Sequence, residues 1–162
     1  MYGASSGLGD ITVTLNSDNS VGKIDSQYTY YLYDSVRLFF ANGGGECYIA
    51  SVGLFGDEIT ADALASGLSA VEKEDHPTIL LSPDAMLLEK QDQAYSFQQA
   101  MLAQCNSLQD RVAVLDIFNG NIDRADKDVI LDFRNGIGIN FLKYGAAYSP
   151  WIMSTFSATF GF

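Results

Sequence analysis

A glycine-rich turn between an amphipathic segment and an apolar run constrains the fold of this chain more than any other feature. Before the turn, apolar residues recur at i, i+4, i+7 and i+8, the spacing of one helix face; they are Leu32, Val36, Phe39 and Phe40. Asn42 and Gly43 are expected to end this helix in the left-handed conformation, because glycine has no Cβ to clash there and asparagine tolerates it. After Gly44 and Gly45, residues 46–52 have the composition of a strand. The sequence therefore predicts one helix joined to one strand by a very short connection.

The direction of this turn argues against a phosphate-binding loop. Such a loop follows a strand and opens a helix, so that the helix N-terminus faces the anion. Here the glycines follow a helix, which presents the negative end of its dipole, and no Gly-Lys-Ser or Gly-Lys-Thr follows them. We therefore interpret the turn as a packing device and expect no nucleotide cofactor.

Strand patterns recur along the chain. They lie at residues 10–15, 46–52, 77–81, 111–117 and 141–148. The first alternates cleanly between apolar and polar side chains, as in a half-buried strand. The run 77–81 is short and continuously apolar, which is typical of a strand buried on both faces. The run 111–117 has the strongest central-strand pattern of the chain.

Helix patterns separate these strands. Residues 16–22 have turn composition, and Asp25 or Ser26 is the expected cap of the helix that leads to the glycine turn. Thr60 is the expected cap of a second helix, because its hydroxyl can accept an otherwise unpaired N–H.

Two further helices are expected in the second half of the chain. A long amphipathic helix has apolar residues at helical spacing; these are Ala94, Phe97, Met101, Cys105 and Leu108. A charged helix spans 122–135, with Val129 and Phe133 facing inward, and stops at Gly136.

The regular alternation of strands and helices predicts the fold class. Apolar central strands separated by helices indicate an α/β three-layer sandwich, with a largely parallel or mixed central sheet flanked by helices. Right-handed crossovers would place helices on both faces. The chain has no internal repeat and no obvious linker, so residues 1–162 are predicted to form a single domain, with 1–9 frayed.

Charge and hydropathy limit the possible partners. The formal net charge is −11 and the pI is near 4.2. The nine Lys and Arg residues are scattered singly and form no basic stripe for nucleic-acid phosphates or for an anionic membrane surface. No apolar run is long enough to span a bilayer, and the start of the chain has no signal-peptide pattern. We expect synthesis in the cytoplasm; the acidity serves either solubility or a basic partner.

The two cysteines do not indicate a metal or redox site. Cys47 and Cys105 lie far apart without CxxC spacing, which argues against a zinc site, a thioredoxin motif and a disulfide scaffold. Both have apolar neighbours, so we expect buried free thiols.

Candidate catalytic residues lie where parallel strands would end. Ser82, Asp84, Asp116 and Ser149 all take this position, where α/β sites are commonly found. The single histidine, His76, precedes its strand, about 17 Å from Ser82 at roughly 3.3 Å per residue. No Gly-x-Ser-x-Gly elbow occurs, so a Ser-His-Asp arrangement is not expected.

An acidic site is the remaining enzymatic alternative. Asp84 and Asp116 could meet at the carboxyl ends of their strands, and oxygen-only ligands suit Mg²⁺. Nothing in their spacing demands a metal, and Asp116 is more simply explained as a cap of the following turn. We predict no catalytic, metal or cofactor-binding residues, and keep a small α/β enzyme as the alternative function.

Four blocks in order resemble the contractile phage tail sheath family. The family's helix-to-strand block is similar to residues 34–49, which read DSVRLFFANGGGECYI. Its short leucine helix, followed by a strand, resembles residues 64–84, which end in Ser-Pro-Asp. Its cysteine-bearing helix end, which leads into Arg-Val-Ala-Val-Leu-Asp, resembles residues 105–116. Its Ala-x-Tyr-x-Pro-Trp block resembles residues 146–151, so that the similarity covers roughly 33–151.

This resemblance implies a structural subunit of a phage tail or a phage-like injection machine. Sheath subunits stack as rings around an inner tube, a homo-oligomer that contracts and drives the tube into a target. The resemblance implies no catalytic residue, no nucleic-acid partner, no membrane insertion, and a location in the virion tail. The matched positions with packing or assembly roles are Phe39, Phe40, Asn42, Gly43, Gly44, Gly45, Cys47, Tyr148, Pro150 and Trp151.

Three of these roles are specific expectations. Phe39 and Phe40 would seat their helix on the sheet, the three glycines would make the tight turn, and Trp151 would close the edge of the core. Sheath subunits usually extend further beyond the Pro-Trp block. The tail, residues 152–162, is apolar and aromatic, which predicts either a fragment of a longer subunit or a tail that joins a neighbour by strand addition.

Overall fold

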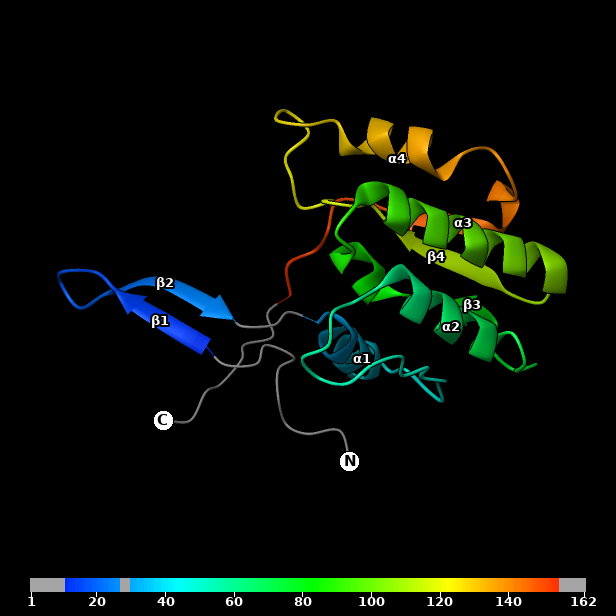
Figure 1. Cartoon of the computed structure of the whole chain (residues 1–162), viewed down its shortest axis with the longest axis horizontal. Coiled ribbons are helices and arrows are strands. Elements are labelled where there is room, and N and C mark those ends of the chain that lie inside the picture. Colours follow the sequence, from blue (N-terminus) through cyan, green and yellow to red (C-terminus); the bar gives the residue numbers. More distant parts are fainter. Residues whose placement is uncertain (1–10, 27–29, 155–162) are drawn as a thin grey trace.

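The computed structural model describes residues 11–26 and 30–154 (Figure 1). Its elements form a small antiparallel hairpin and a larger body in which helices surround a parallel sheet. This confirms a mixed α/β class. None of the described helices is long and apolar enough to cross a membrane.

The hairpin consists of β1 (Ile11–Leu15) and β2 (Val21–Ser26). The strands pair antiparallel, and the Asn16 N–H donates to the Ser20 carbonyl at 2.8 Å in the turn between them. In Figure 1 the hairpin projects away from the other elements. The sequence predicts β1 correctly, but the expected helix cap at Asp25 or Ser26 is wrong because β2 continues through these residues. The local sequence of residues 21–26 indicates a strand only weakly, and the strand is fixed by its pairing with β1.

The main sheet has three short parallel strands in the order β3-β4-β5. These are β3 (Ile79–Leu80), β4 (Val112–Asp116) and β5 (Gly145–Tyr148). β4 is the central strand, as its apolar pattern predicts. Leu80 pairs with Ala113, which in turn pairs with Gly145, and paired residues of a parallel sheet point to the same face.

The core lies between this sheet and α3 (Gln91–Leu108), which runs along β4 in Figure 1. The sheet contributes Leu80, Ala113 and Leu115, all buried. The predicted inward residues of α3 are buried, except Leu108, which is half-buried. A Cβ on Gly145 would lie 2.7 Å from Leu102 Cδ2, so glycine permits the close approach of β5 to α3.

Three glutamines of α3 bind backbone carbonyls of its neighbours. Gln98 Nε2 donates to the Asp116 carbonyl at 2.8 Å, Gln99 Nε2 to Gly136 at 2.7 Å, and Gln104 Nε2 to Leu68 at 2.9 Å. The long helix is therefore joined by hydrogen bonds to the sheet and to the helices on either side of it.

Those flanking helices are α2 (Ala61–Val71) and α4 (Val129–Ile137). Thr60 caps α2 as predicted, because its Oγ1 accepts the Ala63 N–H at 3.2 Å. The predicted bounds of α4 are wrong at both ends. It begins after Asp128, whose Oδ1 accepts the Leu131 N–H, and it continues past Gly136 to Gly138, which has a φ of 73°. Its inward residues are predicted correctly, since Val129 is buried and Phe133 packs against the core.

Three predicted strands differ from the structure. Residues 46–52 form no strand. Their side chains still pack on neighbours: Val52 lies over Gly67 of α2, and Tyr48 stacks on His76. The run 77–81 is buried on one face only, since Ile79 is 61% exposed. The last strand starts late, because residues 142–144 form the 3₁₀ turn η2 (Leu142–Tyr144).

The helix of the glycine turn is α1 (Leu32–Ala41). It lies beside η1 (Pro83–Leu87), the 3₁₀ turn that follows β3. None of the residues of α1 is buried. Leu32 and Val36 are half-buried and Phe39 and Phe40 are exposed, so the predicted apolar face is only partly covered.

Candidate functional site

The glycine turn closes α1 with the hydrogen bonds of a Schellman motif. Gly44 N–H donates to the Phe39 carbonyl at 2.9 Å and Gly43 N–H to the Phe40 carbonyl at 3.1 Å, which satisfies carbonyls that the helix end leaves open. Gly43 has a φ of 87°, the left-handed conformation predicted for it. The Asn42 side chain adds a bond from Nδ2 to the Leu38 carbonyl at 2.8 Å.

Gly44 and Gly45 have different surroundings in this turn. A Cβ on Gly44 would approach the Phe39 ring to 2.3 Å, whereas one on Gly45 would have no neighbour within 4 Å. The tight turn therefore depends on Gly43 for its backbone conformation and on Gly44 for the place of the Phe39 ring.

The two phenylalanines before the turn lie on the surface. Phe39 is 45% and Phe40 is 52% exposed, and their rings pack edge to face with centroids 5.3 Å apart. The expectation that both seat α1 on the sheet is wrong for the isolated chain. Cys47 is likewise exposed, contrary to prediction, whereas Cys105 is buried as a free thiol, as predicted.

Trp151 closes the core at the carboxyl end of β4. Its Nε1–H donates to the Ile117 carbonyl at 2.9 Å, and its backbone N–H donates to the Gly120 carbonyl at 3.2 Å. A Cβ on Gly120 would lie 2.5 Å from the indole, so glycine makes room for the ring. Tyr31 packs edge to face on the same indole at 5.7 Å, and the peptide bond before Pro150 is cis.

Asp84, a candidate for acidic chemistry, binds the start of α1. Its Oδ1 accepts the N–H groups of Tyr31 and Leu32, the latter at 3.2 Å. Burial raises the pKa of the Asp84 carboxyl, while these two hydrogen bonds act in the opposite direction. The carboxylate therefore stabilises a helix N-terminus, where unpaired N–H groups and the helix dipole favour negative charge.

The Asp116 carboxyl is not among the hydrogen-bond partners of Asp84, whose bonds go to the start of α1. Burial raises the pKa of the Asp116 carboxyl, but the residue's hydrogen bond to Gln98 uses its backbone carbonyl. Within residues 11–26 and 30–154, no group of three His, Cys, Asp or Glu residues could hold a metal ion. The Asp84 carboxylate is thus engaged by backbone N–H groups of α1, which gives it a structural role.

The serine and histidine candidates also remain separate. His76 stacks almost parallel on Tyr48, with ring centroids 6.4 Å apart. In the described part of the chain, the hydroxyls of Ser82 and Ser149 form no hydrogen bond with His76 or a carboxylate. These residues therefore form no nucleophile and base pair.

Arg111 is a buried structural residue that the sequence patterns did not reveal. Its Nη1 donates to the Val71 carbonyl at 3.1 Å and its Nη2 to the Glu74 carbonyl at 2.7 Å, so a cation binds the carboxyl end of α2. Its Nε also pairs with Asp110 Oδ1 at 2.7 Å. This pairing holds the pKa of the Asp110 carboxyl below its ordinary value. The only sequence signal was an arginine at the start of the predicted strand 111–117.

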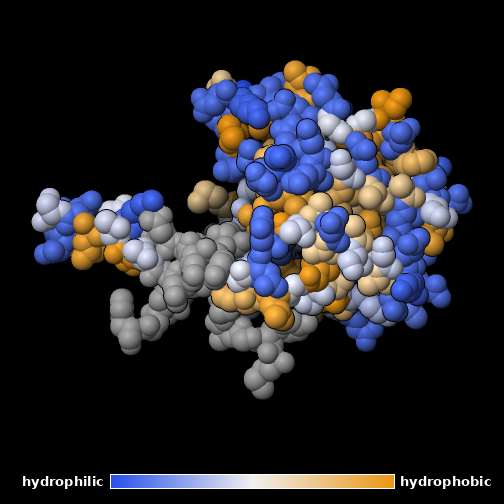
Figure 2. Space-filling view, in the orientation of Figure 1, coloured by the Kyte–Doolittle hydropathy of each residue, from blue (hydrophilic) through white to orange (hydrophobic). Residues whose placement is uncertain are grey.

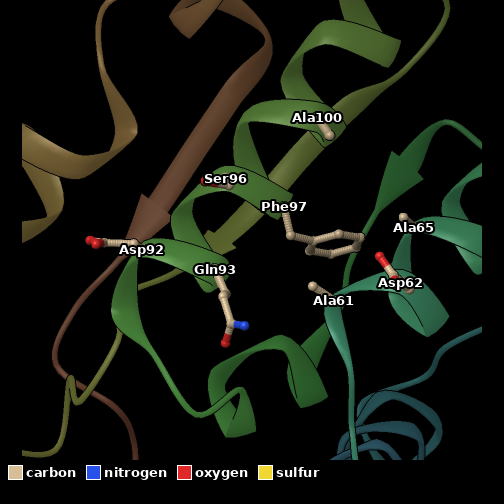
Figure 3. Close-up of a pocket in the computed structure, with 8 residues that line it drawn as sticks. All are labelled: Ala61, Asp62, Ala65, Asp92, Gln93, Ser96, Phe97 and Ala100. Carbon is tan, nitrogen blue, oxygen red and sulfur yellow. The ribbon is translucent and has the colours of Figure 1, made fainter.

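An open groove of about 380 Å³ lies between α2 and α3 (Figure 3). Phe97 is buried at its base, and Figure 3 shows the ring between the two helices. Mostly small and polar residues line it: Ala61, Asp62, Ala65, Asp92, Gln93, Ser96, Phe97 and Ala100. Neither Asp84 nor Asp116 is among them.

The sheet face opposite α3 carries exposed apolar side chains. Ile79 pairs with Val112, and Tyr148 pairs with Asp116, so all four point away from α3. Ile79 and Tyr148 are 61% and 66% exposed. Apolar residues also reach the surface on the face drawn in Figure 2, where they lie among hydrophilic ones. We call the exposed side chains of Ile79, Leu81, Val112, Ala146 and Tyr148 the open sheet face.

No protein-family model matches the chain, and no curated protein matches it in sequence.

Proposed function

We propose that this chain is a structural subunit of a contractile tail sheath, in a phage or a phage-like injection machine. The observation that carries the proposal is the open sheet face, together with the half-exposed Phe39 and Phe40. Large contiguous apolar surfaces on soluble proteins commonly mark sites of association. The four sequence blocks that resemble sheath proteins support the same assignment.

The arrangement of the candidate polar residues supports a structural role over an enzymatic one. Asp84 holds the first turn of α1, Trp151 fills the carboxyl end of the sheet, and the glycine turn shapes the end of α1. These interactions position helices and a strand relative to one another. The function that follows is polymerisation with other copies around an inner tube, in the tail of a particle.

The three-layer arrangement belongs to this proposal. Asp84 anchors the N-terminus of α1 directly after β3, and the apolar face of α1 is not buried. In the assembled particle, we propose that α1 of one copy packs across the open sheet face of the next and completes a third layer. That contact would bury Phe39 and Phe40, as the sequence spacing predicts.

Electron microscopy of the complete expressed subunit tests the proposal. We expect ring-like or helical particles, because the exposed apolar surface favours association. A subunit that remains strictly monomeric under all conditions that assemble sheaths would overturn the proposal. An activity assay is not needed for this distinction, since the readout is the particle itself.

A further inference from the structure

The groove between α2 and α3 lies on the side of the sheet opposite the open sheet face, and its walls suit a third helix. Ala61 and Ala65 are one turn apart on α2, and Ser96 and Ala100 are one turn apart on α3. Small side chains at such spacing leave a channel into which the side chains of another helix can fit. Buried Phe97 supplies an apolar base for that contact.

The charges at the groove have one sign. Figure 3 shows the Asp62 side chain pointing toward the Phe97 ring, whereas Asp92 lies at the other rim with its carboxylate turned outward. No lysine or arginine lines the groove, and in the described ranges neither aspartate forms an ion pair. A ligand that fills the groove would therefore place its own charged group beside an unpaired carboxylate.

We propose that the groove binds an amphipathic helix of a basic protein partner. An aliphatic side chain of that helix would contact Phe97, and a Lys or Arg would pair with Asp62. Charge complementarity selects this occupant, because the charged side chains at the groove, Asp62 and Asp92, are both acidic. The role is independent of the proposed sheath assembly, which would use the open sheet face.

The test uses two fluorescently labelled, alanine-based helical peptides and the full chain. One peptide carries Leu and Lys at i, i+4 spacing, and its match carries Glu in place of Lys. We expect the Lys peptide to bind in fluorescence anisotropy, with an affinity that falls as salt is added, and the Glu peptide not to bind. Equal binding of the two peptides, or no binding of either, would overturn the proposal.

Substitutions on α2 separate the groove from general attraction to an acidic protein. Ala65→Trp fills the groove and should weaken binding by about tenfold or more. Ala70→Trp, at an exposed position on another face of the same helix, should leave the affinity unchanged. If both variants bind equally well, the peptide does not use the groove.

A variant that leaves the groove open tests the charged contact. Asp62→Asn is nearly isosteric and should weaken binding of the Lys peptide and reduce its salt dependence. The midpoint of thermal unfolding should fall only slightly, because the charge of Asp62 lies in the first turn of α2, where it suits the helix dipole. An unaltered salt dependence would exclude Asp62 as the partner of the lysine. Because these measurements use the peptide and the unassembled chain, their failure leaves the outcome of the electron microscopy untouched.

Discussion

The Asp84 carboxylate accepts the backbone N–H of Tyr31, a residue that precedes it by 53 positions. Helix caps usually come from the residue directly before the helix, but Tyr31 offers no side-chain cap to α1. The acceptor instead comes from η1, after β3, so one carboxylate fixes both the start of α1 and its place at the end of the sheet. This contact assigns a structural purpose to the most suggestive acidic residue of the chain.

Replacing Asp84 separates its hydrogen bonds from its charge. Asp84→Ala should lower the free energy of unfolding by about 1–2 kcal/mol, since both N–H groups lose their acceptor. Asp84→Asn keeps an acceptor oxygen and should lose less. Chemical denaturation of both variants checks this order, and equal stabilities for Ala and the parent would show that the cap does not hold α1.

The glycine turn gives a prediction with its own internal control. Gly43→Val should destabilise the chain by about 1–3 kcal/mol, because a β-branched residue is strained at a φ of 87°. Gly45→Val should have a smaller effect, since that position has open space and no left-handed backbone. Thermal unfolding compares the two, and an equal loss for both would contradict the geometry described for the turn.

Local signals in the sequence were sufficient for several elements. Thr60 stands directly before an apolar pattern, and its hydroxyl reaches the N–H of a residue three positions on. The spacing from Ala94 to Cys105 marks a buried helix face without reference to the rest of the chain. The apolar run of β4 identifies a central strand for the same reason.

Contacts between distant parts of the chain could not be predicted in this way. β2 depends on pairing with β1, and the cap of α1 depends on Asp84 in another element. Arg111 binds carbonyls at the end of α2, 37 and 40 residues earlier. In each case the partner is chosen by tertiary packing, about which neither periodicity nor local composition carries information.

Asp116 predicts a pH dependence of stability. Burial raises its pKa above the ordinary 3.8, so the folded chain retains this proton to a higher pH than the unfolded chain. The protonated Asp116 carboxyl therefore makes its full contribution to the free energy of unfolding below the ordinary pKa. This contribution is lost as pH rises through the raised pKa. Asp116→Asn should be at least as stable as the parent at neutral pH, with an advantage that shrinks toward acid. Urea unfolding across this range checks the trend, and a difference independent of pH would contradict it.

Arg111 offers a stability test in the buried part of the chain. Arg111→Met should cost about 3 kcal/mol, because two carbonyls at the end of α2 lose a charged donor in a buried place. Arg111→Lys keeps the charge but lacks the planar fork that reaches both carbonyls, so its loss should be intermediate. The matched control is Arg124→Met, at an exposed ion pair with Asp128, where less than about 1 kcal/mol is expected. Similar losses at both sites would show that the Arg111 contacts contribute little.

The open sheet face provides the sharpest test of assembly. Ile79→Glu places a charge in the surface that we propose becomes covered, where an unpaired carboxylate is costly to bury. Particle formation should therefore be lost. Since Ile79 is already 61% exposed in the single chain, the free energy of unfolding of the monomer should change by less than about 1 kcal/mol. Ile139→Glu alters another exposed isoleucine, away from the sheet, and should leave particles intact. Electron microscopy with a parallel denaturation curve measures both effects, and particles that form normally with Ile79→Glu would show that this face is not covered in the assembly.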